Sequence, residues 1–268
     1  MKSLSNRFLR RTYRLLLVFG FDIRKFIYAI KGSFFYFKGF CRFYLEHRKA
    51  TYKFKKIKFD PVLDNWYTLA GNAKGHYFHQ DLIIAQSIYK NNPNKHIDVG
   101  SRIDGFIAHV ASFREIFIAD IRDFSSTNKA IHYLQVDLMS ELDIDLRECC
   151  DSLSCLHALE HFGVGRYGDP ISYEGYLSGL ENLTKMLQVK GKLYISVPIG
   201  EECINFNAHR IFSLGYFLDL LEKNFVLDKF SYVDDNGDLH ENINIAEKDK
   251  KDSFNCEYGC GIFELTKS

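Results

Sequence analysis

The sequence is poor in several features that mark common classes of protein. Its 268 residues hold four prolines and one tryptophan, and none of the seven cysteines forms a Cys-x-x-Cys pair. An odd number of irregularly spaced cysteines argues against a disulfide framework and is typical of reduced cytosolic thiols. Cys256 and Cys260 are four residues apart, but no second pair lies nearby to complete a tetrahedral site. We therefore expect no bound metal.

The sequence also lacks a long hydrophobic run. Four arginines, Arg7, Arg10, Arg11 and Arg14, precede the apolar run 15–21, which together resemble the outline of a secretory signal. The run holds only seven residues before Asp22 interrupts it, and no small-x-small cleavage site follows. Because a membrane-spanning helix needs about 20 apolar residues, we expect a cytoplasmic protein.

Net charge is nearly absent, at +1, but this total conceals a division of the chain. Residues 1–58 hold 16 Lys/Arg and 2 Asp/Glu, a charge of +14, and residues 59–268 carry −13. The sign changes at Asp60-Pro61, where proline interrupts regular structure. We predict a basic aromatic extension over 1–59, connecting and leading helices over 60–95, and a main domain over 96–268.

The extension combines many aromatic residues with regularly spaced cations. On a helix the basic residues form a narrow stripe: Arg24, Lys31, Lys38 and Arg42. Such a helix suits an anionic membrane surface, so we predict peripheral docking on a membrane or on a protein partner. Packing of the aromatics within the protein is the alternative. The lysines of 53–58 interleave with aromatics as in some nucleic-acid surfaces, but without a nucleic-acid motif we expect no nucleic acid.

The acidic part alternates short apolar runs with amphipathic stretches. Helices are expected at 78–90, 107–113, 173–187 and 213–223, the last with Ser213 as N-cap. Strands are expected at 96–99, 116–119, 133–136, 152–156, 192–197, 226–233 and 261–266. This order predicts an α/β fold: a Rossmann-like, doubly wound, mostly parallel sheet with a late antiparallel strand, preceded by the helical basic extension.

Glycines and acids follow the first three strands. Gly100 and Gly105 come after the first strand, where glycine lets a nucleotide-like ligand approach the backbone. Asp120 ends the second strand, 20 residues after Gly100, the offset at which an acid reaches a ribose diol. Asp137 follows the third strand and is placed to face an adenine amino group. The alternative for both acids is that they cap loops.

The segments IHYLQVDL, DSLSCLHALEHFG, ENLTKMLQVKGKLYISVP and AHRIFSLGYFLDLLEKNF resemble class I S-adenosylmethionine-dependent methyltransferases of the type-11-like branch. Within that group the chain is similar to an uncharacterised methyltransferase-like family associated with bacterial surface-polysaccharide genes. The resemblance covers residues 96–266. It implies S-adenosylmethionine as cofactor and a small or sugar-linked acceptor, with a role in surface glycan biosynthesis.

The same resemblance implies a set of cofactor-binding residues: Asp98, Gly100, Gly105, Asp120, Asp137, Leu138, Leu156 and His157. One departure concerns the loop itself, where the family has alternate glycines and this chain has Arg102 and Asp104. We expect Arg102 either to crowd the methionine part of the cofactor or to bind its carboxylate.

Methyl transfer needs mainly positioning of the acceptor, and a hydroxyl acceptor also needs a base. The candidate bases are His161 and His209, each with a purely structural hydrogen-bonding role as the alternative. The polar loop of Arg166, Tyr167 and Asp169 is expected to cover the acceptor.

Two other interpretations remain open. The segment from His157 to His161 matches H-x-x-E-H, a zinc-protease signature, although no long helix is expected around it. The departures at Arg102 and Asp104 also favour a catalytically degenerate protein that binds a ligand or serves as a scaffold for a membrane-associated assembly.

Overall fold

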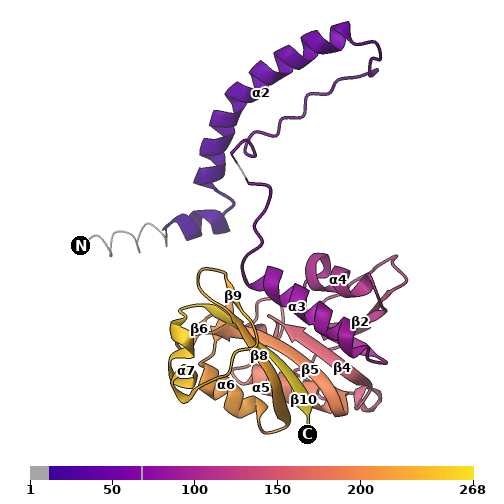
Figure 1. Cartoon of the computed structure of the whole chain (residues 1–268), viewed down its shortest axis with the longest axis vertical. Coiled ribbons are helices and arrows are strands. Elements are labelled where there is room, and N and C mark those ends of the chain that lie inside the picture. Colours follow the sequence, from indigo (N-terminus) through magenta and orange to yellow (C-terminus); the bar gives the residue numbers. More distant parts are fainter. Residues whose placement is uncertain (1–11, 68) are drawn as a thin grey trace, which may run out of the picture. The chain divides into compact units, whose positions relative to one another are not determined.

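The computed structural model describes residues 12–67 and 69–268, so Arg7, Arg10 and Arg11 lie outside the described residues (Figure 1). The chain forms two compact units, divided between Asn72 and Ala73. The finer division into 1–59, 60–95 and 96–268 stays a prediction. The structural boundary comes later than Asp60 because residues 59–67 pack against the long helix of the first unit.

The first unit is built on helix α2 (Ile23–Lys49), which follows a helical stretch at 12–18. Asp22 caps α2 by accepting hydrogen bonds from the backbone N–H groups of Arg24 and Lys25. Gly32 is the buried residue of this helix, and a Cβ atom there would lie 1.7 Å from the Leu63 carbonyl oxygen. Glycine therefore allows residues 59–67 to run directly over the helix backbone.

One face of α2 is covered by these contacts, which include a stacked Phe35–Trp66 pair with centroids 4.5 Å apart. Another face is exposed and apolar, with members spaced three or four residues apart: Ile23, Phe26, Ile30, Phe34 and Phe37. Among the described residues, no helix has both the length and the apolar character needed to cross a bilayer.

The second unit alternates strands and helices. Its helices and helical turns are α3 (His76–Asn91), η1 (Ile103–Ile107), α4 (Ala108–Ala111), η2 (Ile144–Leu146), η3 (Leu159–His161), α5 (Gly175–Met186), α6 (Leu214–Leu221), α7 (Glu247–Asp252) and η4 (Ser253–Asn255). Its strands are β1 (His96–Val99), β2 (Ile116–Asp120), β3 (Ile131–Gln135), β4 (Cys150–Leu156), β5 (Leu187–Ile199), β6 (Cys203–Asn205), β7 (His209–Ile211), β8 (Phe225–Val233), β9 (Leu239–His240) and β10 (Gly259–Lys267).

Eight strands form one sheet in the order β3-β2-β1-β4-β5-β10-β8-β9, and β6 pairs with β7 separately. Strands β1 to β5 are parallel, whereas β10 runs antiparallel between β5 and β8. The prediction of a Rossmann-like, doubly wound, mostly parallel sheet with a late antiparallel strand is confirmed. The direction in which successive strands are added reverses between β1 and β4. The carboxyl ends of these two strands therefore form the topological switch point of the sheet.

Helices cover both faces of the sheet (Figure 1). On one face α3, η1 and α4 pack against the strands through Ile84, Ile88, Phe106 and Val110. On the other face α5 and α6 supply a larger cluster that includes Leu183 and Phe217. The central strands β1 and β4 are almost fully buried between these layers, and their polar residues pair with one another: His96 contacts Ser152 and Ser154, and Ser154 donates to Asp98.

Three local expectations need correction. The helix expected at 107–113 is a π turn followed by the four-residue α4, because the chain must first pass around the loop after β1. Strand β5 is longer than expected, because Leu187 already pairs with Cys150 of β4 and β10 pairs with residues 192–199. Ser213 occupies the N-cap position of α6, but its hydroxyl group donates to Glu202 instead of capping the helix.

Candidate active site

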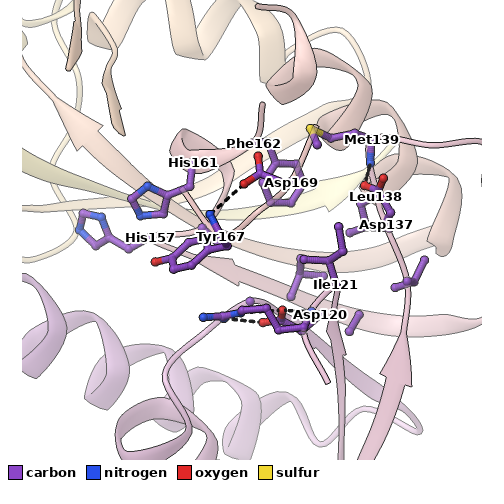
Figure 2. A pocket seen from close by; sticks show the side chains of 16 residues that line it. Asp120, Ile121, Asp137, Leu138, Met139, His157, His161, Phe162, Tyr167 and Asp169 are labelled. Carbon is purple, nitrogen blue, oxygen red and sulfur yellow. Dashed lines mark hydrogen bonds and ion pairs between the residues drawn. The ribbon is translucent and has the colours of Figure 1, made fainter. Parts of the chain in front are cut away.

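A pocket lies at the carboxyl ends of the first four strands, on both sides of the switch point (Figure 2). The pocket is partly open to solvent, and its wall combines apolar side chains with a few polar ones. Each strand contributes a residue at or just beyond its end: Gly100 after β1, Asp120 on β2, Asp137 after β3 and His157 after β4. The structure thus brings together the four positions that the sequence singled out.

The loop after β1 has the backbone freedom that the glycine pattern predicts, but only in part. Gly100 adopts a φ of +68°, and a Cβ atom there would lie 3.1 Å from the Cβ of Ala158. Gly105 does not line the pocket. Its hydrogen faces α3, where a Cβ atom would lie 2.6 Å from Asp81 Oδ2. Gly100 therefore allows the positive-φ turn to pass close to Ala158 at the pocket wall, whereas Gly105 allows the loop to pack on a helix.

Asp98 supports this loop from within the core. It is fully buried and accepts hydrogen bonds from the Ser101 backbone N–H and from the hydroxyl groups of Ser101 and Ser154. Burial raises the pKa of this carboxyl group to about 7. Asp98 does not line the pocket, so its observed contacts position the loop.

Asp120 lines the pocket and is already engaged by an arginine. Arg122 donates from Nε to Oδ1 at 2.9 Å and from a terminal nitrogen to Oδ2 at 2.6 Å, a bidentate pair. The Arg122 guanidinium also lies 4.4 Å from the centroid of the Tyr167 ring. The sequence analysis did not single out Arg122, whose one signal is its position two residues after the acid.

Asp137 and Leu138 form the opposite wall. Asp137 accepts from the Met139 backbone N–H and from the Ser140 hydroxyl group, each at 2.8 Å. It therefore stabilises the turn after β3 while also lining the pocket. Leu138 is buried and presents an apolar surface beside it.

Arg102 does not enter this pocket. Its half-exposed side chain pairs with Asp104 at 3.3 Å and lies 4.9 Å from the Tyr77 ring centroid. It borders a neighbouring opening that also reaches Gly100 and Tyr167. With these contacts, the Arg102 side chain does not occupy space in the main pocket.

Leu156 ends β4, where it packs in the core and borders the neighbouring opening, and His157 follows it. His157 is buried in the left-handed backbone region, with a φ of +51°. Such a conformation is strained for a residue other than glycine and is common at functional sites. Its Nδ1 lies 2.7 Å from Glu160 Oε1, and its Nε2 lies 3.1 Å from His76 Nδ1.

His161 lines both openings and is better placed as a base than His209. His161 Nδ1 donates to the Ala208 carbonyl at 2.6 Å, which leaves the lone pair on Nε2. Burial lowers the pKa of His161, so the ring is neutral near pH 7. Burial also lowers the pKa of His209, but Asn205 donates to its Nε2 at 3.2 Å, and it does not line the pocket.

The loop after η3 is held by its own hydrogen bonds and borders the pocket. Asp169 accepts from the backbone N–H groups of Gly163, Gly165 and Tyr167, which fixes the turn. Tyr167 and Asp169 line the pocket, whereas Arg166 borders the neighbouring opening. The buried Arg210, another residue that the sequence analysis missed, holds this region through the carbonyls of Phe162 and Tyr173.

The H-x-x-E-H segment does not have the geometry of the zinc-protease motif. His161 lies on the short turn η3, and His157 precedes it in a left-handed conformation. The two imidazoles have separate partners, His76 and the Ala208 carbonyl. Two histidines of that motif must instead share one face of a helix.

These features define a doubly wound α/β protein with a ligand pocket at its switch point. The model of the family described as "Caenorhabditis protein of unknown function, DUF268" matches residues 117–257, more than half of the chain. The chain therefore belongs to this family. Among curated proteins, no sequence matches it.

Several solved structures are similar in fold. The N-methyltransferase NodS from Bradyrhizobium japonicum WM9, with S-adenosyl-L-homocysteine, is 10% identical with a TM-score of 0.48, covering 72% of this chain and 88% of NodS. The 1,6-didemethyltoxoflavin-N1-methyltransferase from Burkholderia thailandensis is 13% identical with a TM-score of 0.48, covering 70% and 78%. The [4+2]-cyclase SpnF is 14% identical with a TM-score of 0.43, covering 65% and 75%. At these scores the likeness carries no argument about activity, which rests on the geometry of the site.

Proposed function

We propose that this protein is an S-adenosylmethionine-dependent methyltransferase that acts on a small-molecule acceptor. The observation that carries the proposal is the meeting of Gly100, Asp120, Leu138 and His157 in one pocket at the switch point. A glycine turn, a strand-end acid at the ribose offset and an apolar wall are the elements that a nucleoside ligand requires.

The residues present fit this cofactor. The space above Gly100 accepts its amino-acid part, the Asp120 carboxylate accepts from the ribose hydroxyl groups, and Leu138 packs on the adenine ring. When bound, the sulfonium supplies an activated methyl group. The protein then has to orient the acceptor and exclude water, and Tyr167 lies over the pocket to do so.

His161 is the base of this proposal. Its neutral Nε2 is turned away from the Ala208 carbonyl, has Arg166 as a long-range donor at 3.5 Å, and receives the acceptor proton in this proposal. Arg166 lies within 3.5 Å of the ring and opposes its protonation. A hydroxyl acceptor fits this base, and a sugar-linked acceptor in surface glycan biosynthesis is the finer form of the proposal.

Isothermal titration with S-adenosylmethionine and S-adenosylhomocysteine tests the cofactor proposal. Asp120→Asn is expected to weaken binding about 10- to 100-fold, since a hydrogen bond to a charged group contributes about 1.5–3 kcal/mol. Asp123→Asn, at an exposed neighbouring position, is the control and is expected to bind normally. Absence of heat with folded wild-type protein would favour the degenerate ligand-binding or scaffold protein instead.

For the extension we propose docking on an anionic membrane surface, which makes this a peripheral protein of the cytoplasmic face. Support comes from α2, where the basic stripe runs beside the exposed apolar face of Ile23, Phe26, Ile30, Phe34 and Phe37. The opposite face is covered by residues 59–67, so internal packing accounts for only part of the aromatic content. A cationic border beside an apolar face is typical of interfacial helices.

Flotation of the full chain with vesicles containing phosphatidylserine tests this docking. Replacing Arg24, Lys31, Lys38 and Arg42 with glutamine is expected to release the protein, since each cation contributes about 1 kcal/mol. The matched control replaces Lys53, Lys55, Lys56 and Lys58, which are exposed outside α2. Equal losses in both variants would show that net charge alone, and not the stripe, drives binding.

A further inference from the structure

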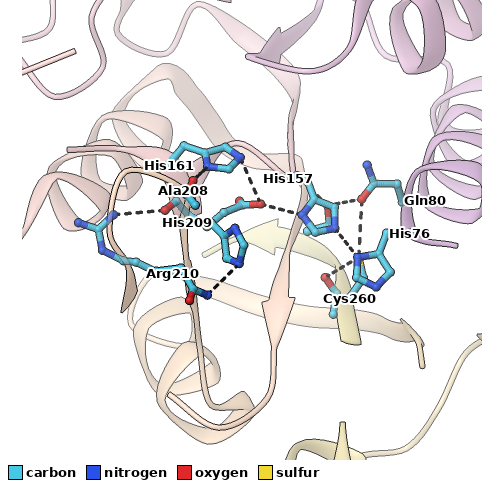
Figure 3. Close-up of polar contacts among 12 residues, drawn as sticks. His76, Gln80, His157, His161, Ala208, His209, Arg210 and Cys260 are labelled. Carbon is cyan, nitrogen blue, oxygen red and sulfur yellow. Dashed lines mark hydrogen bonds and ion pairs between the residues drawn. The ribbon is translucent and has the colours of Figure 1, made fainter. Parts of the chain in front are cut away.

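Three potential metal ligands meet beside the pocket although they are distant in sequence. His76 is the first residue of α3, His157 follows β4, and Cys260 lies on β10 (Figure 3). Their nearest ligand atoms all lie within 4.8 Å of one another. His157 and Cys260 are buried, and His76 is partly buried. We propose that these three side chains bind one zinc ion, with a fourth position left for water.

The spacing of the two imidazoles is close to that of two ligands on one ion. His76 Nδ1 and His157 Nε2 are 3.1 Å apart. Two nitrogens at the usual zinc–nitrogen distance, arranged tetrahedrally, are about 3.3 Å apart.

Glu160 orients the His157 imidazole through a hydrogen bond. Its Oε1 accepts from His157 Nδ1 at 2.7 Å, which fixes the imidazole with Nε2 directed at His76. A carboxylate that holds the second nitrogen of a ligating histidine is the usual outer partner of a zinc site. Glu160 is 1% exposed, and the neighbouring imidazoles hold the pKa of its carboxyl group below the usual value despite its burial.

Metal binding would displace the Cys260 proton to solvent, and this leaves no buried acceptor unsatisfied. Its thiol lies 3.6 Å from Gln80 Oε1, a long contact, and the same oxygen accepts from the Ser196 hydroxyl group at 2.7 Å. When Cys260 becomes a thiolate, Gln80 therefore keeps Ser196 as its donor. A divalent ion is then balanced by two negative charges, the Cys260 thiolate and the Glu160 carboxylate.

The donor set excludes the metals that prefer oxygen. Two imidazole nitrogens and one thiolate suit zinc and other late first-row metals, whereas magnesium and calcium prefer oxygen ligands. Three protein ligands leave one tetrahedral position open, and His157 also lines the pocket. His157 is therefore the proposed ligand that connects this cluster to the pocket, because neither His76 nor Cys260 lines it. None of these contacts depends on the proposed methyl transfer.

The test titrates the metal-free full chain with Co²⁺, whose complex with a thiolate has a charge-transfer band, and then displaces it with Zn²⁺. One equivalent of Co²⁺ per chain and a charge-transfer band are expected for the wild type. The band is expected to disappear in Cys260→Ser and to persist in Cys203→Ser, a control at an exposed cysteine. His76→Gln, at a partly exposed position, is expected to weaken Co²⁺ binding while circular dichroism stays unchanged.

Glu160→Gln separates a metal site from a simple hydrogen-bonded histidine pair. It is expected to keep the charge-transfer band while lowering Co²⁺ affinity about 10- to 100-fold, as loss of an outer partner does. Absence of the band in folded wild-type protein would overturn the proposal. So would a band that survives Cys260→Ser, since the ion would then be bound by other thiols such as Cys149 and Cys150. Cofactor titration is a separate readout, so either proposal can fail alone.

Discussion

Arg122 binds both carboxylate oxygens of Asp120, the residue that the ribose offset marks for the cofactor. A carboxylate has about four acceptor positions, and Arg122 fills three of them with its backbone N–H, Nε and a terminal nitrogen. A ribose diol needs two. Cofactor binding therefore has to displace at least part of this pair.

Arg122→Ala is expected to tighten binding of S-adenosylhomocysteine by up to about fivefold. Arg122 is 48% exposed, and pairs of this kind are worth at most about 1 kcal/mol, so the gain is modest. Calorimetric titration measures it, with Arg147→Ala as a control at an exposed position outside the pocket. Weaker binding in Arg122→Ala would mean that the guanidinium itself contacts the cofactor.

The two candidate bases are separable by substitution. His161→Asn is expected to lower the rate of methyl transfer about 10²- to 10⁴-fold, the usual contribution of a general base, with cofactor affinity retained. His209→Asn is expected to cost less than tenfold, because Asn205 already occupies its Nε2. Because the pKa of His161 is lowered, the wild-type rate should stay constant near pH 7 and fall only below pH 6.5. A rate that falls as pH rises through neutrality contradicts this assignment.

His96 gives the fold a specific pH dependence. It is fully buried between the hydroxyl groups of Ser152 and Ser154, and burial lowers its pKa to about 3. In the unfolded chain the pKa is near 6.5, so the unfolded state binds the proton first and stability is lost as pH falls from about 6.5 towards 3. The contribution to the slope is about 1.4 kcal/mol per pH unit.

Urea unfolding of the wild type and His96→Gln between pH 4 and 6 measures this contribution. The difference in unfolding free energy between the two proteins is expected to shrink as the pH falls. Parallel curves for the two proteins would show that His96 does not bind the additional proton on unfolding.

Two glycines of α2 offer a matched comparison. Gly39 has open space around it, so Gly39→Ala is expected to stabilise the helix by about 1 kcal/mol and to slow its amide exchange about fivefold. Gly32→Ala places a methyl group against the Leu63 carbonyl, so exchange in 59–67 is expected to accelerate. Hydrogen exchange with mass spectrometry measures the exchange rates of α2 and of residues 59–67 in both variants. Equal behaviour of the two variants would contradict the observed packing of 59–67 on α2.

The alternation of apolar runs and amphipathic stretches was sufficient to predict the fold class, because strands buried on both faces leave a clear pattern in the sequence. It also predicted that Gly100, Asp120 and Asp137 come together, since the carboxyl ends of parallel strands share one edge. It did not indicate that Gly105 packs against Asp81 of α3, and a role of Gly105 in cofactor binding stays a prediction. Nothing in the local pattern of the loop indicates which helix will pack on it.

The sequence by itself determined which residues end the strands, and so which side chains border the site. Only the tertiary structure decided that β10 enters between β5 and β8, which places Cys260 near His76 and His157. It also decided that Arg122 turns back onto Asp120. The physical reason is that periodicity depends on near neighbours along the chain, whereas strand order and side-chain pairing depend on long-range packing.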